Sequence, residues 1–178
     1  TDKYVRFRDV FLAVIDKRGG GARHKGTVTG LATGFYDLDY KTSGLQPSDL
    51  ILIAARPSMG KTAFVLNLAQ YMCVRNHVPT AIFSLEMSKD QLVNRILSME
   101  SKVDSQSMRT GTLQPADWEK LIESAGVIST APLIIDDTPG ISITELRSKC
   151  RKYKLENDLG LVIIDYLQLM TGGSKKQE

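Results

Sequence analysis

Short apolar runs alternate along most of the chain with longer segments in which apolar residues recur at helical spacing. The runs cover residues 50–55, 80–85, 132–136 and 161–165, and the amphipathic segments cover residues 61–76, 88–101, 115–127 and 142–156. The runs have the length of buried strands, and strands that alternate with helices are typical of a mostly parallel sheet with helices on its faces. The pattern therefore predicts an α/β fold.

Two of these helices carry start signals. Ser88 is followed three residues later by Gln91, and Ser142 is followed in the same way by Glu145. In such a capping box the serine side chain accepts a hydrogen bond from the third residue's backbone, and that residue's side chain bonds back to the serine N–H. We therefore expect helices to begin at both serines.

The first part of the chain has a different pattern. Residues 4–17 place apolar side chains opposite charged ones at helical spacing, which predicts an amphipathic helix. Residues 19–26 are rich in glycine and charge, which predicts a flexible tether. We therefore expect a linker helix (1–18), a tether (19–26) and an α/β domain (27–178). The helix either packs on its own domain or docks on a neighbouring subunit.

The composition fits one globular domain, with 178 residues, 42% of them hydrophobic and 24% charged. A net charge of +3 is too small to hold a polyanion by itself, so contact with nucleic acid requires a local basic patch. Cys73 and Cys150 lie far apart in predicted helices, which favours reduced thiols and a cytoplasmic location. No run of about 18 apolar residues and no leader of the signal type is present, so we expect no membrane segment.

A candidate phosphate-binding loop lies between the first apolar run and the helix after it. It comprises Ala55, Arg56, Pro57, Ser58, Met59, Gly60, Lys61 and Thr62. The segment fits the P-loop pattern except that Ala55 stands where the first glycine is usual. Backbone N–H groups at a helix N-terminus can cradle a triphosphate, Lys61 can reach its β- and γ-phosphates, and the Thr62 hydroxyl can bind Mg²⁺. The loop therefore predicts ATP and Mg²⁺ as ligands, and its flanking strand and helix argue against a chance match.

Two carboxylates fit the chemistry of such a loop. Asp165 ends an apolar run, as in the Walker B arrangement, where an acid at the end of a strand supports Mg²⁺. The next residue is Tyr166 rather than the glutamate that often activates water, so the base must come from elsewhere. We expect Glu86 to be that base, because it follows the run 80–85 and should emerge at the same edge of the sheet. The alternative is that Glu86 merely precedes the helix at Ser88.

Asp136 and Asp137 also end an apolar run. The Pro139-Gly140 pair after them indicates a turn. We therefore favour a structural role for these two acids over contact with the nucleotide.

Three segments together resemble the first conserved motifs of the DnaB-type replicative helicases. They are residues 55–62, 84–88 and 163–170. The alanine at position 55 is similar to that family's version of the loop, and residues 33–45 resemble its approach to the first strand. The resemblance covers the chain from about Thr27 and implies a RecA-like P-loop NTPase.

The resemblance implies roles for individual residues. Lys61 binds phosphate and also counts as a catalytic residue, and Thr62 binds the metal. Glu86 polarises the attacking water, and Asp165 supports Mg²⁺. Lys175 and Lys176 stand at the entrance to loops that contact single-stranded DNA, although two lysines also fit a solvated surface.

The resemblance also implies an assembly. Members form a homohexameric ring that translocates on single-stranded DNA, separates the duplex and meets a primase and a helicase loader, with the linker helix docked on the adjacent subunit. The family's sensor glutamine and arginine finger do not follow Glu178. We therefore interpret the chain as a fragment truncated before its C-terminal strands, which alone binds nucleotide with little turnover.

An ATP-dependent replicative DNA helicase is the expected function. The alternative is a RecA-like scaffold in which ATP governs assembly or loading, and strong stimulation of hydrolysis by single-stranded DNA distinguishes the two. A small-molecule phosphotransferase fits less well, because the sequence shows no acceptor pocket or arginine-rich lid to exclude water.

Overall fold

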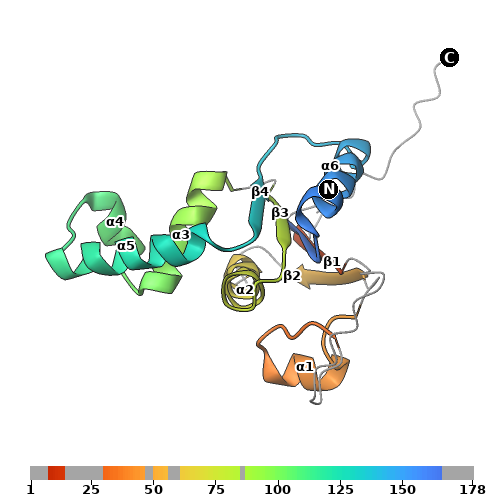
Figure 1. Cartoon of the computed structure of the whole chain (residues 1–178), viewed down its shortest axis with the longest axis horizontal. Coiled ribbons are helices and arrows are strands. Elements are labelled where there is room, and N and C mark those ends of the chain that lie inside the picture. Colours follow the sequence, from red (N-terminus) through yellow and green to blue (C-terminus); the bar gives the residue numbers. More distant parts are fainter. Residues whose placement is uncertain (1–7, 15–29, 47–49, 56–60, 85–86, 166–178) are drawn as a thin grey trace, which may run out of the picture.

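The computed structural model of the chain describes residues 8–14, 30–46, 50–55, 61–84 and 87–165 (Figure 1). In chain order the elements of these residues are β1 (Arg8–Val14), α1 (Tyr36–Thr42), β2 (Leu50–Ala55), α2 (Lys61–Leu68), the π-helix η1 (Ala69–Arg75), β3 (Thr80–Ser84), α3 (Lys89–Ser101), α4 (Ser105–Thr110), α5 (Pro115–Ser129), β4 (Leu133–Asp136), α6 (Ile143–Asn157) and β5 (Leu161–Asp165). The predicted strands and helices from residue 50 onward are confirmed to within a few residues. The short helices α1 and α4 were not predicted.

The described strands form one sheet in the order β2-β1-β5-β3-β4. Strand β3 is parallel to both of its neighbours, β4 and β5. Strand β1 is antiparallel to both β2 and β5, so β2 and β5 run in the same direction as each other. The predicted mostly parallel sheet is therefore confirmed, with β1 as its one antiparallel member among the described strands.

The helix predicted over residues 4–17 is wrong for residues 8–14, which form β1. The strand lies between β2 and β5 and pairs with both. A short apolar run is compatible with either helix or strand, and pairing with a strand on each side favours the strand in this context. The rest of the predicted linker helix lies outside the described residues, as does the whole of the predicted tether.

Alternate residues of the central strands face two separate cores. Ile82 of β3 and Ile163 of β5 pack on one face with the buried side chains of α2, η1 and α3. Phe83 and Val162 point to the opposite face, where α6 covers them with Tyr153 among others. Figure 1 shows α2 and α6 on opposite sides of the sheet. This alternation follows from the period-two geometry of a strand and makes the chain a three-layer α/β domain.

The segment between β3 and β4 forms a helical lobe of α3, α4 and α5, which extends away from the sheet in Figure 1. Helix α3 starts with the predicted capping box, in which Ser88 and Gln91 bond each other's backbone N–H groups. Ser142 caps α6 by accepting from the N–H of Glu145, which is one of the two bonds of the predicted capping box. Both predicted helix starts are therefore confirmed.

Both cysteines are free. Burial raises the pKa of the Cys73 thiol to about 11, although hydrogen bonds with Thr80 oppose the shift. Burial also raises the pKa of Cys150. A thiol with a raised pKa is a poor nucleophile and metal ligand at neutral pH, as expected for a packed side chain.

Candidate functional site

The carboxyl ends of the parallel strands meet at one edge of the sheet. Ser84, the last residue of β3, is in register with Asp165, the last residue of β5. On the other side of β3, Phe83 is in register with Asp136, which ends β4. Open α/β sheets bind their ligands at this edge, so the register brings together the strand ends that the sequence singles out.

Strand β2 reaches the same edge from the other side of β1. Val10 pairs with Ile53 on β2 and with Asp165 on β5, which sets these two residues at the same level of the sheet. Ala55 therefore ends β2 two residues beyond the level of Asp165. The predicted phosphate loop begins at Ala55 and so starts from the edge at which Asp165 lies.

The predicted loop is flanked by the strand and helix that a P-loop requires. Lys61 is the first residue of α2, and no acidic residue lies in the first turn of this helix. Thr62 follows it and is half-buried. Arg56, Pro57, Ser58, Met59 and Gly60 lie outside the described residues. A helix start that follows a strand in this way offers free N–H groups and positive potential to an anion.

Asp165 has the position expected of a metal-supporting acid. Its side chain is buried, with a relative exposure of 3%. Helix α2, which carries Thr62, packs against β5, which carries Asp165. A hydroxyl and a single carboxylate are hard oxygen donors that suit Mg²⁺ when the phosphates of a nucleotide complete its shell. The donor set of these two side chains therefore fits the predicted Mg²⁺.

Glu86 lies outside the described residues, but the residues on both sides of positions 85 and 86 are held together. The Ser84 hydroxyl donates to the Met87 carbonyl at 2.8 Å and accepts from the Met87 N–H at 3.2 Å. Ser84 is itself buried. The chain that leaves β3 is thus tied back to the end of its own strand.

The Asp136 carboxylate is hydrogen-bonded to other residues of the domain. Its carboxylate accepts from Lys149 Nζ at 2.7 Å and from the Thr138 N–H at 2.9 Å. Burial alone raises the pKa of Asp136, but these hydrogen bonds and the Lys149 charge outweigh it and hold the pKa below its ordinary value. The structural role that the sequence favours for Asp136 agrees with these contacts.

Asp137 also has a protein partner, which the sequence did not reveal. Its carboxylate accepts a hydrogen bond of 2.8 Å from the backbone N–H of Lys89 at the start of α3. The two residues are 48 positions apart, so no local pattern could have indicated the contact.

The residues just before α1 pack against α2 and η1. The Phe35 and Phe64 rings stack with centroids 5.0 Å apart. A side chain at Gly34 would approach the Tyr71 ring to 2.7 Å, and its φ of +87° favours glycine. The sequence offered no signal for this packing beyond the likeness of residues 33–45 to a known motif region.

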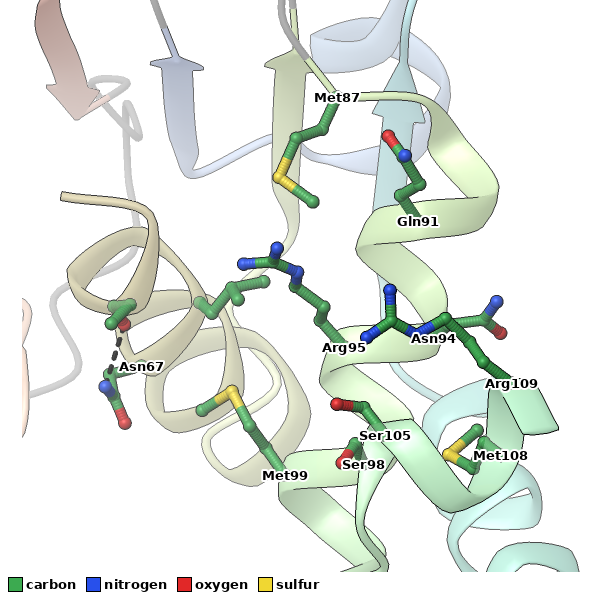
Figure 2. A pocket seen from close by; sticks show the side chains of 12 residues that line it. Asn67, Met87, Gln91, Asn94, Arg95, Ser98, Met99, Ser105, Met108 and Arg109 are labelled. Atoms are coloured by element: carbon green, nitrogen blue, oxygen red, sulfur yellow. Dashed lines mark hydrogen bonds between the residues drawn. The ribbon is translucent and has the colours of Figure 1, made fainter. Parts of the chain in front are cut away.

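A cleft of about 770 Å³ lies between α2, α3 and α4 (Figure 2). It is lined by Ala63, Leu66, Asn67, Met87, Gln91, Asn94, Arg95, Ser98, Met99, Ser105, Met108 and Arg109. Figure 2 shows Arg95 extending from α3 toward α2, with Met87 and Met99 pointing into the cleft. The lining contains two arginines and no carboxylate, and through Met87 it borders the chain segment that follows β3.

The sequence also bears on DNA contact, metal sites and membrane segments, and the described residues cover these only in part. Lys175 and Lys176 lie outside them. Within residues 8–165, apart from the gaps given above, no three His, Cys, Asp or Glu side chains gather into a metal site. Every helix in those same ranges is too short or too polar to span a bilayer.

Comparisons with known proteins agree with this geometry. The profile of the DnaB-like helicase C terminal domain matches residues 30–178. The replicative DNA helicase DnaB of Geobacillus stearothermophilus is 46% identical over 175 residues, which are 98% of this chain and 38% of that protein. The chain thus spans less than two fifths of that relative's length.

Two solved structures are also similar. One is described as an ATPase domain and superposes with a TM-score of 0.71 at 32% identity, over 86% of this chain and 55% of that one. A DnaB-like replicative helicase, described with its interactions with primase, gives a TM-score of 0.63 at 32% identity, over 74% of this chain and 32% of the other. The chain belongs to the DnaB-like helicase C-terminal domain family.

Proposed function

We propose that this domain binds and hydrolyses Mg-ATP at the carboxyl edge of its sheet, as the motor of a replicative DNA helicase. The observation that carries the proposal is the register of the strands. It brings the ends of β2, β3 and β5, at Ala55, Ser84 and Asp165, to one edge of the sheet. Nucleotide-dependent P-loop enzymes need these three parts within reach of one triphosphate.

Each proposed residue has one task. Residues 55–62 cradle the phosphates through backbone N–H groups, and Lys61 neutralises charge on the β- and γ-phosphates. Thr62 and Asp165 hold Mg²⁺, which supplies charge compensation for the phosphates when it is bound. Glu86 accepts a proton from the attacking water. The tie between Ser84 and Met87 supports the assignment of Glu86, because a base must be held at a fixed distance from its water.

For the whole protein we propose a homohexameric ring that moves on single-stranded DNA and separates the duplex. Family membership supports this, and so do the relatives named as replicative helicases. Primase as a partner is supported by the similar helicase described with it. A helicase loader and DNA contact by Lys175 and Lys176 belong to the same proposal.

The first experiment measures Mg-ATP binding and hydrolysis by this chain, with and without single-stranded DNA. Binding with little turnover is expected, because we propose that an arginine finger is supplied from outside these residues. Failure to bind Mg-ATP would contradict the proposal. In the full-length protein, hydrolysis that does not respond to single-stranded DNA would favour a nucleotide-governed scaffold instead.

Substitutions in the full-length protein test the residue roles. Lys61→Ala should weaken ATP binding and hydrolysis together, whereas Glu86→Gln should keep binding and lower hydrolysis by about 10²-fold or more. Lys154→Ala is a matched control, because Lys154 is exposed on α6. Near-normal turnover in Glu86→Gln would show that another group is the base.

A further inference from the structure

One hydrogen bond joins the start of α3 to a loop far away in the sequence. The Asp137 carboxylate, just after β4, accepts from the N–H of Lys89, the first residue of α3. Most side-chain caps are local, as in this same helix, where Ser88 and Gln91 bond each other's backbone. The bond to Asp137 therefore ties two elements together rather than completing a local motif.

Helix α3 does not need Asp137 in order to begin. Its capping box already satisfies the N–H groups of Ser88 and Gln91. The N–H of Lys89 is exposed and water could serve it, as is usual in a first helical turn. What Asp137 adds is a fixed position for this turn relative to β4.

The loop that presents Asp137 is itself anchored. Asp136 binds Lys149 of α6 at 2.7 Å and the Thr138 N–H at 2.9 Å, and Lys149 also donates to the Thr138 hydroxyl at 3.0 Å. These bonds surround Asp137 on both sides in the sequence. Its carboxylate is therefore carried on a braced turn.

The segment between β3 and α3 is held from two strands. On the side of β3, Ser84 bonds both backbone groups of Met87. On the side of β4, Asp137 bonds Lys89. In the sequence, position 86, which carries the proposed base, stands between Ser84 and Met87 and three residues before Lys89, so the two ties flank it.

We propose that Asp137 is a positioning residue for ATP hydrolysis, which fixes the backbone that carries Glu86. The inference rests on the proposed function, because it requires Glu86 to be the base. Without the tie to β4, the first turn of α3 and the backbone before it gain freedom to shift. A displacement of about 1 Å in a reacting group can cost about 10²-fold in rate, and a base must stay within hydrogen-bond reach of its water.

The test uses the full-length protein and measures the single-turnover rate of hydrolysis at saturating Mg-ATP, together with the Kd for ATP. Asp137→Ala should lower the rate about tenfold and leave Kd unchanged, because binding uses the phosphate loop. Asp137→Asn keeps an acceptor oxygen and should restore most of the rate. Asp137→Glu keeps the charge but changes the reach of the carboxylate, and its rate should fall between those of the other two.

Asp104→Ala is the matched control. Asp104 caps α4 by accepting from the Gln106 N–H at 3.1 Å, and that helix has no tie to the ends of the strands among the described residues. The control should melt at a temperature similar to that of Asp137→Ala and hydrolyse at the normal rate. If Asp137→Ala matches this control in rate, the bond is only a structural cap. If Asp137→Ala does not fold, an unchanged rate in Asp137→Glu overturns the proposal in the same way.

A double substitution separates this inference from the function on which it rests. In the Glu86→Gln background, Asp137→Ala should cause no further loss, because the group that it positions is already disabled. An additional tenfold loss would show that Asp137 acts through something other than Glu86. Normal turnover in Glu86→Gln alone would overturn the assigned base and this inference together, whereas an inactive Glu86→Gln with a normal Asp137→Ala overturns only the inference.

Discussion

The two strands that flank β3 both end in an aspartate at the same edge of the sheet, yet the two acids have different surroundings. Asp136 on β4 is paired with Lys149 of α6 at 2.7 Å. Asp165 on β5 is in register with Ser84, where the chain departs toward the proposed base, and it lies on the strand against which α2 packs. Asp136 thus shows that an acid at the end of a strand can serve a structural ion pair.

The largest expected difference between the two acids is in hydrolysis. In the full-length protein, Asp165→Asn should lower the single-turnover rate by about 10²-fold or more, because the proposed Mg²⁺ support loses its charge. Asp136→Asn should lower the rate far less, because Asp136 pairs with Lys149 and bears on the proposed site only by bracing the turn that presents Asp137. Rapid-quench measurement of phosphate release compares the two variants directly. Equal losses in both variants would contradict different roles for the two acids.

A smaller effect is expected on thermal stability, when the charge of Asp136 is removed. Asp136→Asn should lower Tm by about 2–4 °C, because it removes a charged acceptor whose side chain is only 10% exposed. Glu145→Gln is the matched control, because its carboxylate lies 3.7 Å from the same lysine and is 47% exposed, where ion pairs contribute little. Thermal unfolding followed by circular dichroism measures both. A larger Tm shift in Glu145→Gln than in Asp136→Asn would show that Glu145, not Asp136, is the more stabilising partner of Lys149.

The smallest effect concerns pH. Because the folded-state pKa of Asp136 lies below its ordinary value, the stability it contributes is present above the ordinary aspartate pKa of about 3.9 and is lost as pH falls through the folded value. The difference in Tm between the wild type and Asp136→Asn should therefore be constant near neutral pH and shrink below about pH 4. Melting curves of both proteins between neutral and acid pH measure it. A difference that grows toward acid pH would contradict the lowered pKa.

The parallel strands and the helices around them could be predicted from the chain because each has a strong local signal. Strands β3 and β5 are short apolar runs, and α3 starts at a capping box whose two residues are only three positions apart. The same reasoning predicts that the strands ending at Ala55 and Asp165 share an edge, because the ends of parallel strands do so, and the register of the strands confirms this. These inferences needed only neighbours in the sequence.

Strand β1 shows where local signals fail. Its residues suit an amphipathic helix, and a strand is preferred only because β2 and β5 lie on both sides of it. The hydrogen bond between Asp137 and Lys89 could not be predicted either, because it joins a side chain to a backbone group 48 residues away. Hydrogen-bond partners that come from distant elements leave no spacing in the sequence.

The sequence alone thus indicated the fold family, a candidate phosphate loop and the strand-terminal acids Asp136 and Asp165, because helix caps, strand periodicity and loop motifs act over a few residues. The tertiary structure decided that Asp136 is paired with Lys149, that β1 fills the place between β2 and β5, and that the Asp137 carboxylate bonds the start of α3. Those outcomes depend on which elements pack side by side, and packing brings together charges and backbone groups that the chain keeps far apart.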